Sequence, residues 1–368
     1  MSSSRSFRLA ISTLGAVMVT AGLLTGPALA DPDAASPGVA VPATDPVTAV
    51  TDRLAAQLTG KYAAEAKRFG LFPTTAEQTV NLADAPADSA LGRAVRAANQ
   101  EVLAAKGLPS DSAPLLTVRL ADPSMTSALR RGVAPLVASS PSDDEATSVI
   151  AYDRDAKPVP LDAERIPDRP VYLVEIDSAA ALAEGMDVMR STLAERGQTA
   201  QVRAAAGYWA TQVTSIRLND DHEPWHKGSA EIFAIAAGFG PDGKVKVDTV
   251  QMPYLDHDGT TYYPGQLLVH FSSYKYDLAD LVLMEEDSGT NYRDLALALS
   301  QALLTIIDGG VYIPLVNAIL NALPDGWWTD DPDYVDSFYT LATTTTGTRA
   351  GAGANATMTV APYWVAPL

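Results

Sequence analysis

The chain has 368 residues and carries 44 Asp and Glu against 26 Lys and Arg, a net charge of −18 at neutral pH. This negative excess argues against a nucleic-acid backbone or an anionic membrane surface as partner. The absence of cysteine excludes disulfides, thiolate catalysis and thiolate metal ligation.

The first 30 residues have the three parts of a secretory signal peptide. Arg5 and Arg8 form a positive start, an apolar stretch covers about 9–24, and the sequence ALA at 28–30 is a small-x-small cleavage site. We therefore expect cleavage after Ala30 and a secreted, extracellular protein. No later apolar run reaches the roughly 18 residues of a spanning helix, so membrane spanning is not expected after cleavage.

The next part of the chain alternates between helix and strand patterns. Residues 31–45 are rich in Pro and Ala without periodicity, which indicates a flexible leader. From residue 46 to about 200 the apolar spacing switches between the helical and the extended period, which predicts an α+β domain. Helices are expected at 46–70, 87–107, 123–132 and 178–197, and strands at 114–120, 134–138, 147–153 and 170–177.

Residues 201–368 have mainly strand patterns separated by acidic or Gly-rich turns, which predicts an antiparallel β-sandwich. Two apolar segments, 295–307 and 311–323, interrupt the series and predict a helical hairpin inserted over 292–323. The predicted fold class is therefore α+β, with an N-terminal α+β domain at 46–200 and a β-sandwich, C2-like in pattern, at 201–368. Its strands are expected at 208–218, 229–239, 246–252, 265–274, 280–284, 335–346 and 355–365.

The negative charge is concentrated in the second domain, where residues 219–336 carry a local charge of −15. Closely packed carboxylates need a counter-charge, and Ca²⁺ supplies it with about six to eight oxygen ligands in flexible geometry. Alternate loops of a sandwich fall at one end, so we expect a structural calcium site there. The alternative is that these acids form turns and solvated surface. The leading ligands are Asp220, Asp221, Glu223, Glu231, Glu286 and Asp287.

Residues 222–226 spell the His-Glu-x-x-His signature of zinc metalloproteases. The working motif lies on a helix, and Pro224 inside a helix would cost about 3 kcal/mol. Strand patterns on both sides leave no room for that helix, so we expect an accidental match. Zinc stays open as the alternative cofactor, in a hydrolase with Glu223 as base and His222 and His226 as ligands, or in another geometry that includes His257.

Several other functions stay open, and whether the protein is an enzyme is left undecided. No G-x-S-x-G, P-loop or G-x-G-x-x-G motif is present. Trp327-Trp328 and Tyr262-Tyr263 suggest a cell-wall or glycan-binding module as one alternative.

Each arm of the predicted helical hairpin would span about 20 Å against a bilayer core of about 30 Å, so the hairpin is expected to pack against the protein, with lipid or partner contact as the alternative. The expected partner is an unidentified extracellular ligand or surface.

The segment "VTSIRLNDDHEPWHKGSAEIFAIAAG", with "PVYLVEID" upstream, carries a family resemblance. It resembles an exported bacterial family classed only as a domain of unknown function, and "DDHEPW…AEI" is the most specific part. The similarity is expected to cover residues from about 100 to 365. The resemblance implies secretion and a two-part layout, and it implies no activity.

Overall fold

The computed structural model describes residues 45–75, 77–141, 146–201, 207–220, 224–228, 230–286, 289–323 and 334–367. The chain from Thr44 to Leu368 forms one compact unit. The predicted signal peptide and residues 31–44 of the predicted leader lie outside the described residues, so cleavage and export remain predictions.

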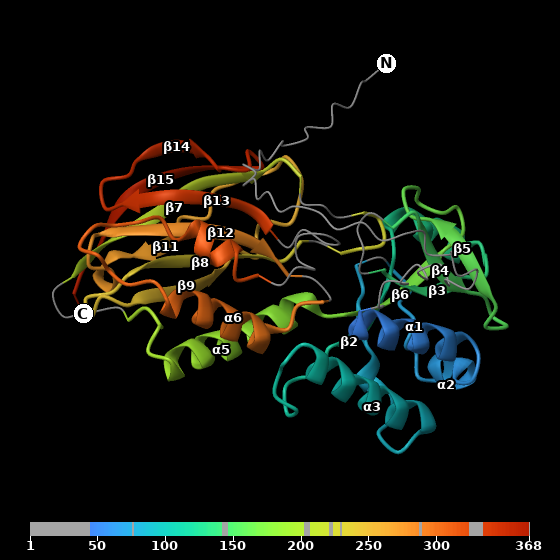
Figure 1. The fold of residues 1–368 in the computed structure, drawn as a ribbon. Helices are drawn as coiled ribbons and strands as arrows, with labels where there is room; N and C mark the ends of the chain where they lie inside the picture. The colour runs from blue at the N-terminus through green and yellow to red at the C-terminus, as the bar shows by residue number, and fades with distance from the viewer. Residues whose placement is uncertain are drawn as a thin grey trace, which may run out of the picture. The chain divides into compact units, whose positions relative to one another are not determined.

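The N-terminal part is a mixed six-stranded sheet with helices, in the strand order β1-β2-β6-β3-β4-β5 (Figure 1). β3 and β6 are parallel, and the other neighbouring pairs are antiparallel. The helices are α1 (Pro46–Thr59), α2 (Ala63–Arg68), α3 (Ala90–Ala105), α4 (Thr126–Arg130) and α5 (Ser178–Glu195). The strands are β1 (Val80–Asn81), β2 (Leu116–Leu120), β3 (Leu136–Ser139), β4 (Ser148–Tyr152), β5 (Pro158–Asp162) and β6 (Val171–Ile176).

Local signals explain where α1 begins and ends. The Asp45 side chain accepts a hydrogen bond from the Thr48 N–H at 2.8 Å, and Pro46 occupies the first helical position. Val47, Leu54 and other residues of the buried face pack against the sheet. The helix ends at Gly60, so the helix predicted over 46–70 is divided into α1 and α2.

The C-terminal part contains two antiparallel sheets, with the orders β10-β7-β15-β14 and β13-β12-β8-β9; β11 also pairs with β7. The α+β class and the predicted long strands are confirmed, whereas β10 and β14 were not predicted. The first sheet contains β7 (Tyr208–Leu218), β10 (Thr261–Tyr262), β11 (Gln266–His270), β14 (Gly347–Ala350) and β15 (Ala356–Val365). The second contains β8 (Ile232–Phe239), β9 (Val245–Gln251), β12 (Leu278–Glu285) and β13 (Tyr334–Ala342).

β8 lies between two hydrophobic cores, and all eight of its residues are buried. Phe233 and Ile235 belong to the core that includes α5 and the N-terminal sheet. Ile232 and Ala234 belong to a second core, shared with β7 and β15 of the other sheet. Because successive strand residues point to opposite faces, one strand contributes to both cores, which explains its continuous apolar sequence.

The predicted hairpin is helical mainly in its first arm. That arm forms α6 (Tyr292–Leu304), whereas the second contains only the short α7 (Val316–Leu320). Gly309, Gly310 and Pro314 lie in the connection, and these residue types disfavour a continuous helix. Within the described ranges, none of the helices has the length and apolar character needed to span a membrane.

Candidate functional site

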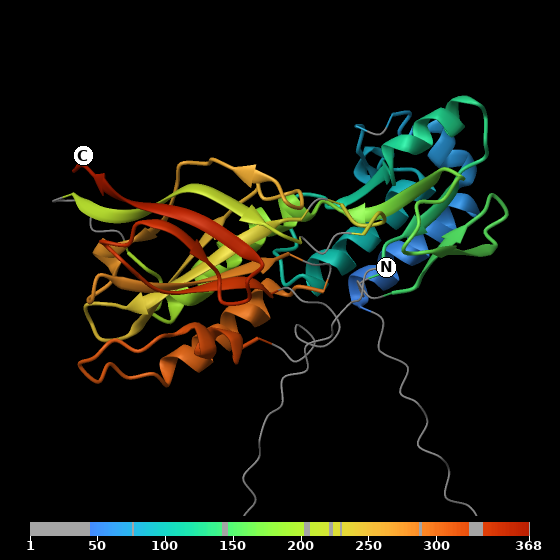
Figure 2. The ribbon, with the colours of Figure 1, turned by 90° about the horizontal axis from the view of Figure 1, so that it is seen from above.

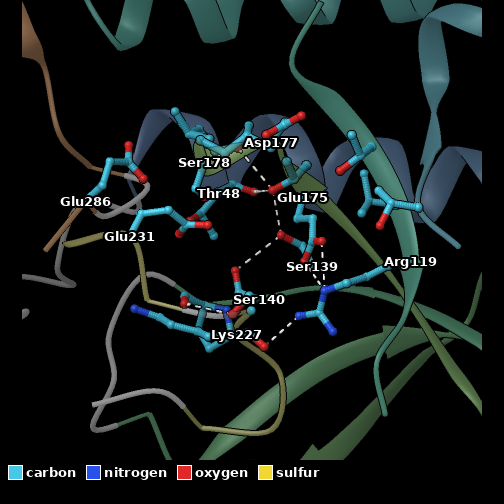
Figure 3. A pocket seen from close by; sticks show the side chains of 18 residues that line it. Thr48, Arg119, Ser139, Ser140, Glu175, Asp177, Ser178, Lys227, Glu231 and Glu286 are labelled. Atoms are coloured by element: carbon cyan, nitrogen blue, oxygen red, sulfur yellow. Dashed lines mark hydrogen bonds and ion pairs between the residues drawn. The ribbon is translucent and has the colours of Figure 1, made fainter. Parts of the chain in front are cut away.

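A cavity of about 340 Å³ lies where β3 and β6 end, beside the first turns of α1 and the residues Lys227, Gly228 and Glu231 (Figure 3). Because β3 and β6 are parallel, their carboxyl ends meet at the same edge of the sheet, where ligands of α/β proteins commonly bind. Elements distant in the sequence therefore converge here. The polar and charged residues that line it include Thr51, Thr117, Arg119, Ser139, Ser140, Glu175, Asp177, Lys227, Glu231 and Glu286.

Hydroxyl groups form one wall of this cavity. The Thr51 and Ser139 hydroxyls are 2.5 Å apart, which joins α1 to the end of β3. Thr117 on β2 also lines the cavity, although only 4 % of its surface is exposed. In the described ranges no hydrogen bond is found for its hydroxyl. A hydroxyl that lines a cavity and has no protein partner is suited to binding a ligand or water.

An ion pair between Arg119 and Glu175 crosses from β2 to β6. The Arg119 Nε lies 2.8 Å and 2.9 Å from the two carboxylate oxygens of Glu175. The same guanidinium donates to the Lys227 carbonyl oxygen at 2.6 Å, so it also fixes Lys227 in the cavity lining. Burial raises the pKa of the Glu175 carboxyl, and the Arg119 charge opposes that rise.

A second ion pair, between Lys106 and Glu286, lies behind the cavity and is fully buried. Glu286 Oε1 accepts hydrogen bonds from Lys106 Nζ and, at 2.9 Å, from the Tyr292 hydroxyl. The Tyr292 N–H in turn donates to the Lys106 carbonyl oxygen at 3.0 Å. The C-terminal end of α3 is thereby joined to the start of α6, and Glu286 is held at the cavity wall.

His226 lies in a turn beside the cavity and is fully buried. Its Nδ1 is 2.8 Å from the Ser140 hydroxyl, and its ring contacts that of Trp225 edge-on, with the centroids 5.5 Å apart. The Lys227 N–H donates to the Pro224 carbonyl oxygen at 2.9 Å. Residues 224–228 are therefore a turn rather than the helix that the protease motif requires. His222 and Glu223 lie outside the described residues.

The structure brings together two of the six predicted calcium ligands. Glu231 and Glu286 both line the cavity, and the Glu286 N–H donates to the Glu231 carbonyl oxygen at 3.0 Å. Figure 3 shows them on the side of the cavity opposite Arg119. Across the described part of the chain, no group of three or more potential metal ligands is found. The other predicted residues that lie outside it are Asp221, Glu223 and Asp287, together with Trp327 and Trp328.

Asp220, the sixth predicted ligand, is not part of the cavity lining. Its N–H donates to the Asn355 side chain at 3.1 Å, and the Asn355 amide donates back to the Asp220 carbonyl oxygen at 2.9 Å. Asp336, from another acidic turn, accepts hydrogen bonds from the N–H groups of Asn355, Gly353 and Ala356. Asp336 therefore orders the turn before β15.

The family model for DUF3103 matches residues 53–368. The chain belongs to DUF3103, a protein family of unknown function. The match includes all elements that line the cavity except the start of α1. No curated protein and no solved structure matches this DUF3103 protein.

The acidic turns of the sequence include Glu231 and Glu286 on one side of the cavity, whereas the residues on its other side were not predicted. Lys106, Thr117, Arg119, Ser139 and Glu175 all come from the N-terminal part, where no functional motif was recognised. Thr117 and Arg119 alternate on β2 among buried apolar residues, a polar signal in an otherwise apolar strand. That pattern alone could have indicated a polar site at this sheet.

Proposed function

We propose that this DUF3103 protein is an exported binding protein that holds a small polar molecule in the cavity. The observation that carries the proposal is the cavity itself, a volume of about 340 Å³ bounded by hydroxyl groups and two ion pairs. Small-molecule sites have volumes of roughly 300–1,000 Å³ and a few converging polar groups. The signal-peptide pattern of residues 1–30 supports export.

The charges of the lining indicate what kind of molecule fits. Glu175, Asp177 and Glu231 bring carboxylates to the cavity, against the cations Arg119 and Lys227, whereas the Glu286 side chain is fully buried in the wall. Lys106 offsets Glu286, and Arg119 offsets Glu175. The remaining excess is negative and favours a ligand with amino or hydroxyl groups, which can donate hydrogen bonds to carboxylates.

A melting-temperature screen with amines, amino acids, amino sugars and short peptides tests this proposal. A compound that stabilises the protein should bind Thr117→Val about 3- to 10-fold more weakly, because one hydrogen bond contributes about 0.5–1.5 kcal/mol. Thr249→Val is the matched control, since Thr249 is also a buried strand threonine and lies on β9, away from the cavity. Equal loss of affinity in both variants, or no stabilising compound, would reject the cavity as the site.

We also propose that Ca²⁺ is a structural cofactor of the acidic loops, within a C2-like β-sandwich formed by the two C-terminal sheets. The second hydrophobic core, which takes side chains from both sheets, supports the sandwich. The proximity of Glu231 to Glu286 supports the calcium site. Glu231 is the leading ligand among the described residues, because it lines the cavity whereas the Glu286 side chain is fully buried.

Metal analysis of the secreted protein, with melting curves in chelator and added Ca²⁺ or Zn²⁺, tests the cofactor. Stabilisation by Ca²⁺ that is lost in Glu231→Gln would support calcium. Stoichiometric zinc would instead support the hydrolase alternative, and Glu223→Gln should then abolish a peptidase activity. Protein without metal, and without a response to either ion, would reject both cofactors.

A further inference from the structure

We propose that the protein docks on a lipid bilayer surface with electrically neutral headgroups, through the end of its C-terminal strands that lies away from the cavity. Two exposed apolar features carry this inference, one in the α6–α7 connection and one where β7 pairs with β15. Neither contributes to the cavity, so the proposal is independent of the ligand proposed above.

The first feature, here called the apolar tip, is formed by Leu304, the last residue of α6, and the connection that follows it as far as Ile313. Its large apolar side chains are exposed to solvent: 84 % for Ile307, 71 % for Val311, and 47 % for both Leu304 and Ile313. The Gly309-Gly310 turn lies between them. Exposed apolar groups gathered in one short segment indicate an interaction site rather than ordinary surface.

The charge within the apolar tip is turned inward. The Asp308 side chain is only 7 % exposed, and its carboxylate accepts from Lys275 Nζ at 2.5 Å and from the Tyr276 hydroxyl at 2.6 Å. The hydroxyl of Thr305, the other polar side chain near the turn, donates to the Ala302 carbonyl oxygen at 2.7 Å. The tip therefore offers apolar groups to a partner while its polar side chains are satisfied internally.

The second feature is a group of half-exposed aromatics, Trp209, Tyr363 and Trp364, with exposed fractions of 46 %, 44 % and 47 %. Trp209 and Trp364 are directly opposite in the register of β7 and β15, with ring centroids 5.3 Å apart. Trp and Tyr are enriched at membrane–water interfaces, where the ring is apolar and its N–H or O–H meets water.

Both features lie at the same end of the strands. The Lys275 N–H donates to the carbonyl oxygen of Phe239, the last residue of β8, which places the apolar tip at that end through the Lys275–Asp308 pair. β8 begins beside Glu231 of the cavity, about 25 Å away at a rise of about 3.3 Å per residue. Trp209 is at the start of β7, whose other end leads toward residues 224–228. In both ribbon views the end of β15, marked C, lies away from β3, β4 and β5 (Figures 1 and 2).

A bilayer fits these two features better than a protein partner does. A protein surface usually pairs polar rim groups as well as apolar ones. Within residues 304–313 the only charged side chain is the nearly buried Asp308, and the exposed charge beside it is that of its partner Lys275, which is 43 % exposed. A lysine at the edge of an apolar patch can extend its ammonium group to the headgroup level. Shallow insertion of aliphatic groups beside interfacial Trp and Tyr needs no such pairing. The net charge of −18 disfavours anionic lipids, so the headgroups are expected to be neutral overall.

Flotation of the mature chain with phosphatidylcholine vesicles tests the proposal. We expect binding to these vesicles, weaker binding when anionic lipid is added, and at least a tenfold loss of binding in Ile307→Asn/Val311→Asn. The matched control is Val133→Asn/Ile166→Asn, since both residues are exposed and lie in the N-terminal part. This control should bind as the unaltered protein does.

Three results would overturn the proposal. The first is no flotation with phosphatidylcholine at any lipid concentration. The second is equal flotation of the tip variant and the control. The third is self-association in analytical ultracentrifugation that the tip variant abolishes, which would assign the tip to a second copy of the chain. Melting curves of both variants ensure that only folded proteins are compared.

Discussion

The buried ion pair between Lys106 and Glu286 is the single-residue feature on which the cavity wall most depends. Both side chains have no exposed surface. Removing two charges from water is costly unless their geometry and further hydrogen bonds compensate, and Tyr292 supplies such a bond. The pair joins α3 to the residue that follows β12, so its loss should affect both stability and the cavity.

Replacing one member of this pair should be strongly destabilising. Lys106→Met leaves a buried carboxylate without its cation, and we expect a loss of about 3–5 kcal/mol in the free energy of unfolding. Lys106→Met/Glu286→Gln should recover most of that loss, because no uncompensated charge remains. Urea unfolding measures both. Arg53→Met, which breaks an exposed pair with Glu101, is the control and should cost about 0–1 kcal/mol. If the double variant loses the sum of the stability losses of Lys106→Met and Glu286→Gln, the two side chains do not stabilise the fold as a pair.

The Asp308 carboxylate gives a pH dependence that can be measured. Hydrogen bonds from Lys275 and Tyr276 lower the pKa of Asp308 to about 2, below the value of about 3.9 in unfolded chains. Because the folded pKa is the lower one, this carboxylate stabilises the fold above about pH 4, and the contribution is lost as the pH falls towards 2. Asp308→Asn should therefore show a smaller fall in melting temperature between pH 5 and pH 2. Asp187→Asn, at an exposed pair, should leave that fall unchanged; an equal effect of both would contradict the assignment.

At the scale of elements, patterning predicted the long strands because burial dictates their composition. β7, β8 and β15 are rich in apolar and β-branched residues, and the structure places them where predicted. β14 was missed because its sequence, Gly-Thr-Arg-Ala, is exposed throughout and is held by pairing with β15. The second hairpin arm has an apolar composition that suits a helix or a packed coil equally, and local sequence does not decide between them.

The site was less predictable than the fold, because its members meet only through tertiary packing. The basic residue Lys106 lies just after α3, where a cation near a helix end is ordinary. Only the contact with a carboxylate 180 positions away gives it a role. For Asp220 and Asp336 the converse holds. Both stand out in the sequence as acidic turn residues, but the structure places them against Asn355 and not in the cavity lining.

The packing of α5 against α6 depends on the absence of a side chain at Gly185. A Cβ built there would lie 2.4 Å from the ring of the fully buried Tyr292. Gly185→Ala should therefore destabilise the protein by about 1–3 kcal/mol through overpacking, although alanine favours helices. Ser191→Ala, at an exposed position of α5, is the control and should be neutral or slightly stabilising. A rise in melting temperature for Gly185→Ala would show that this packing is looser than the structure indicates.

At the scale of the whole molecule, one hydrophobic core extends through both parts of the chain. It includes Val47 of α1, Met189 of α5 and Leu299 of α6. The predicted boundary near residue 200 does not divide this core, so we expect a single cooperative transition in calorimetry, with equal calorimetric and van't Hoff enthalpies. Two separate transitions would show that the parts unfold independently and that the cavity between them is not held rigidly.

Mass spectrometry of the natively expressed protein, under native and then denaturing conditions, tests directly whether the cavity holds a ligand. We expect a small polar molecule, released on denaturation at close to one per chain. It should be reduced or absent in Thr117→Val and retained in Thr249→Val. A chain that carries no such molecule, and whose melting temperature responds to no polar compound, would contradict a ligand-binding role for the cavity.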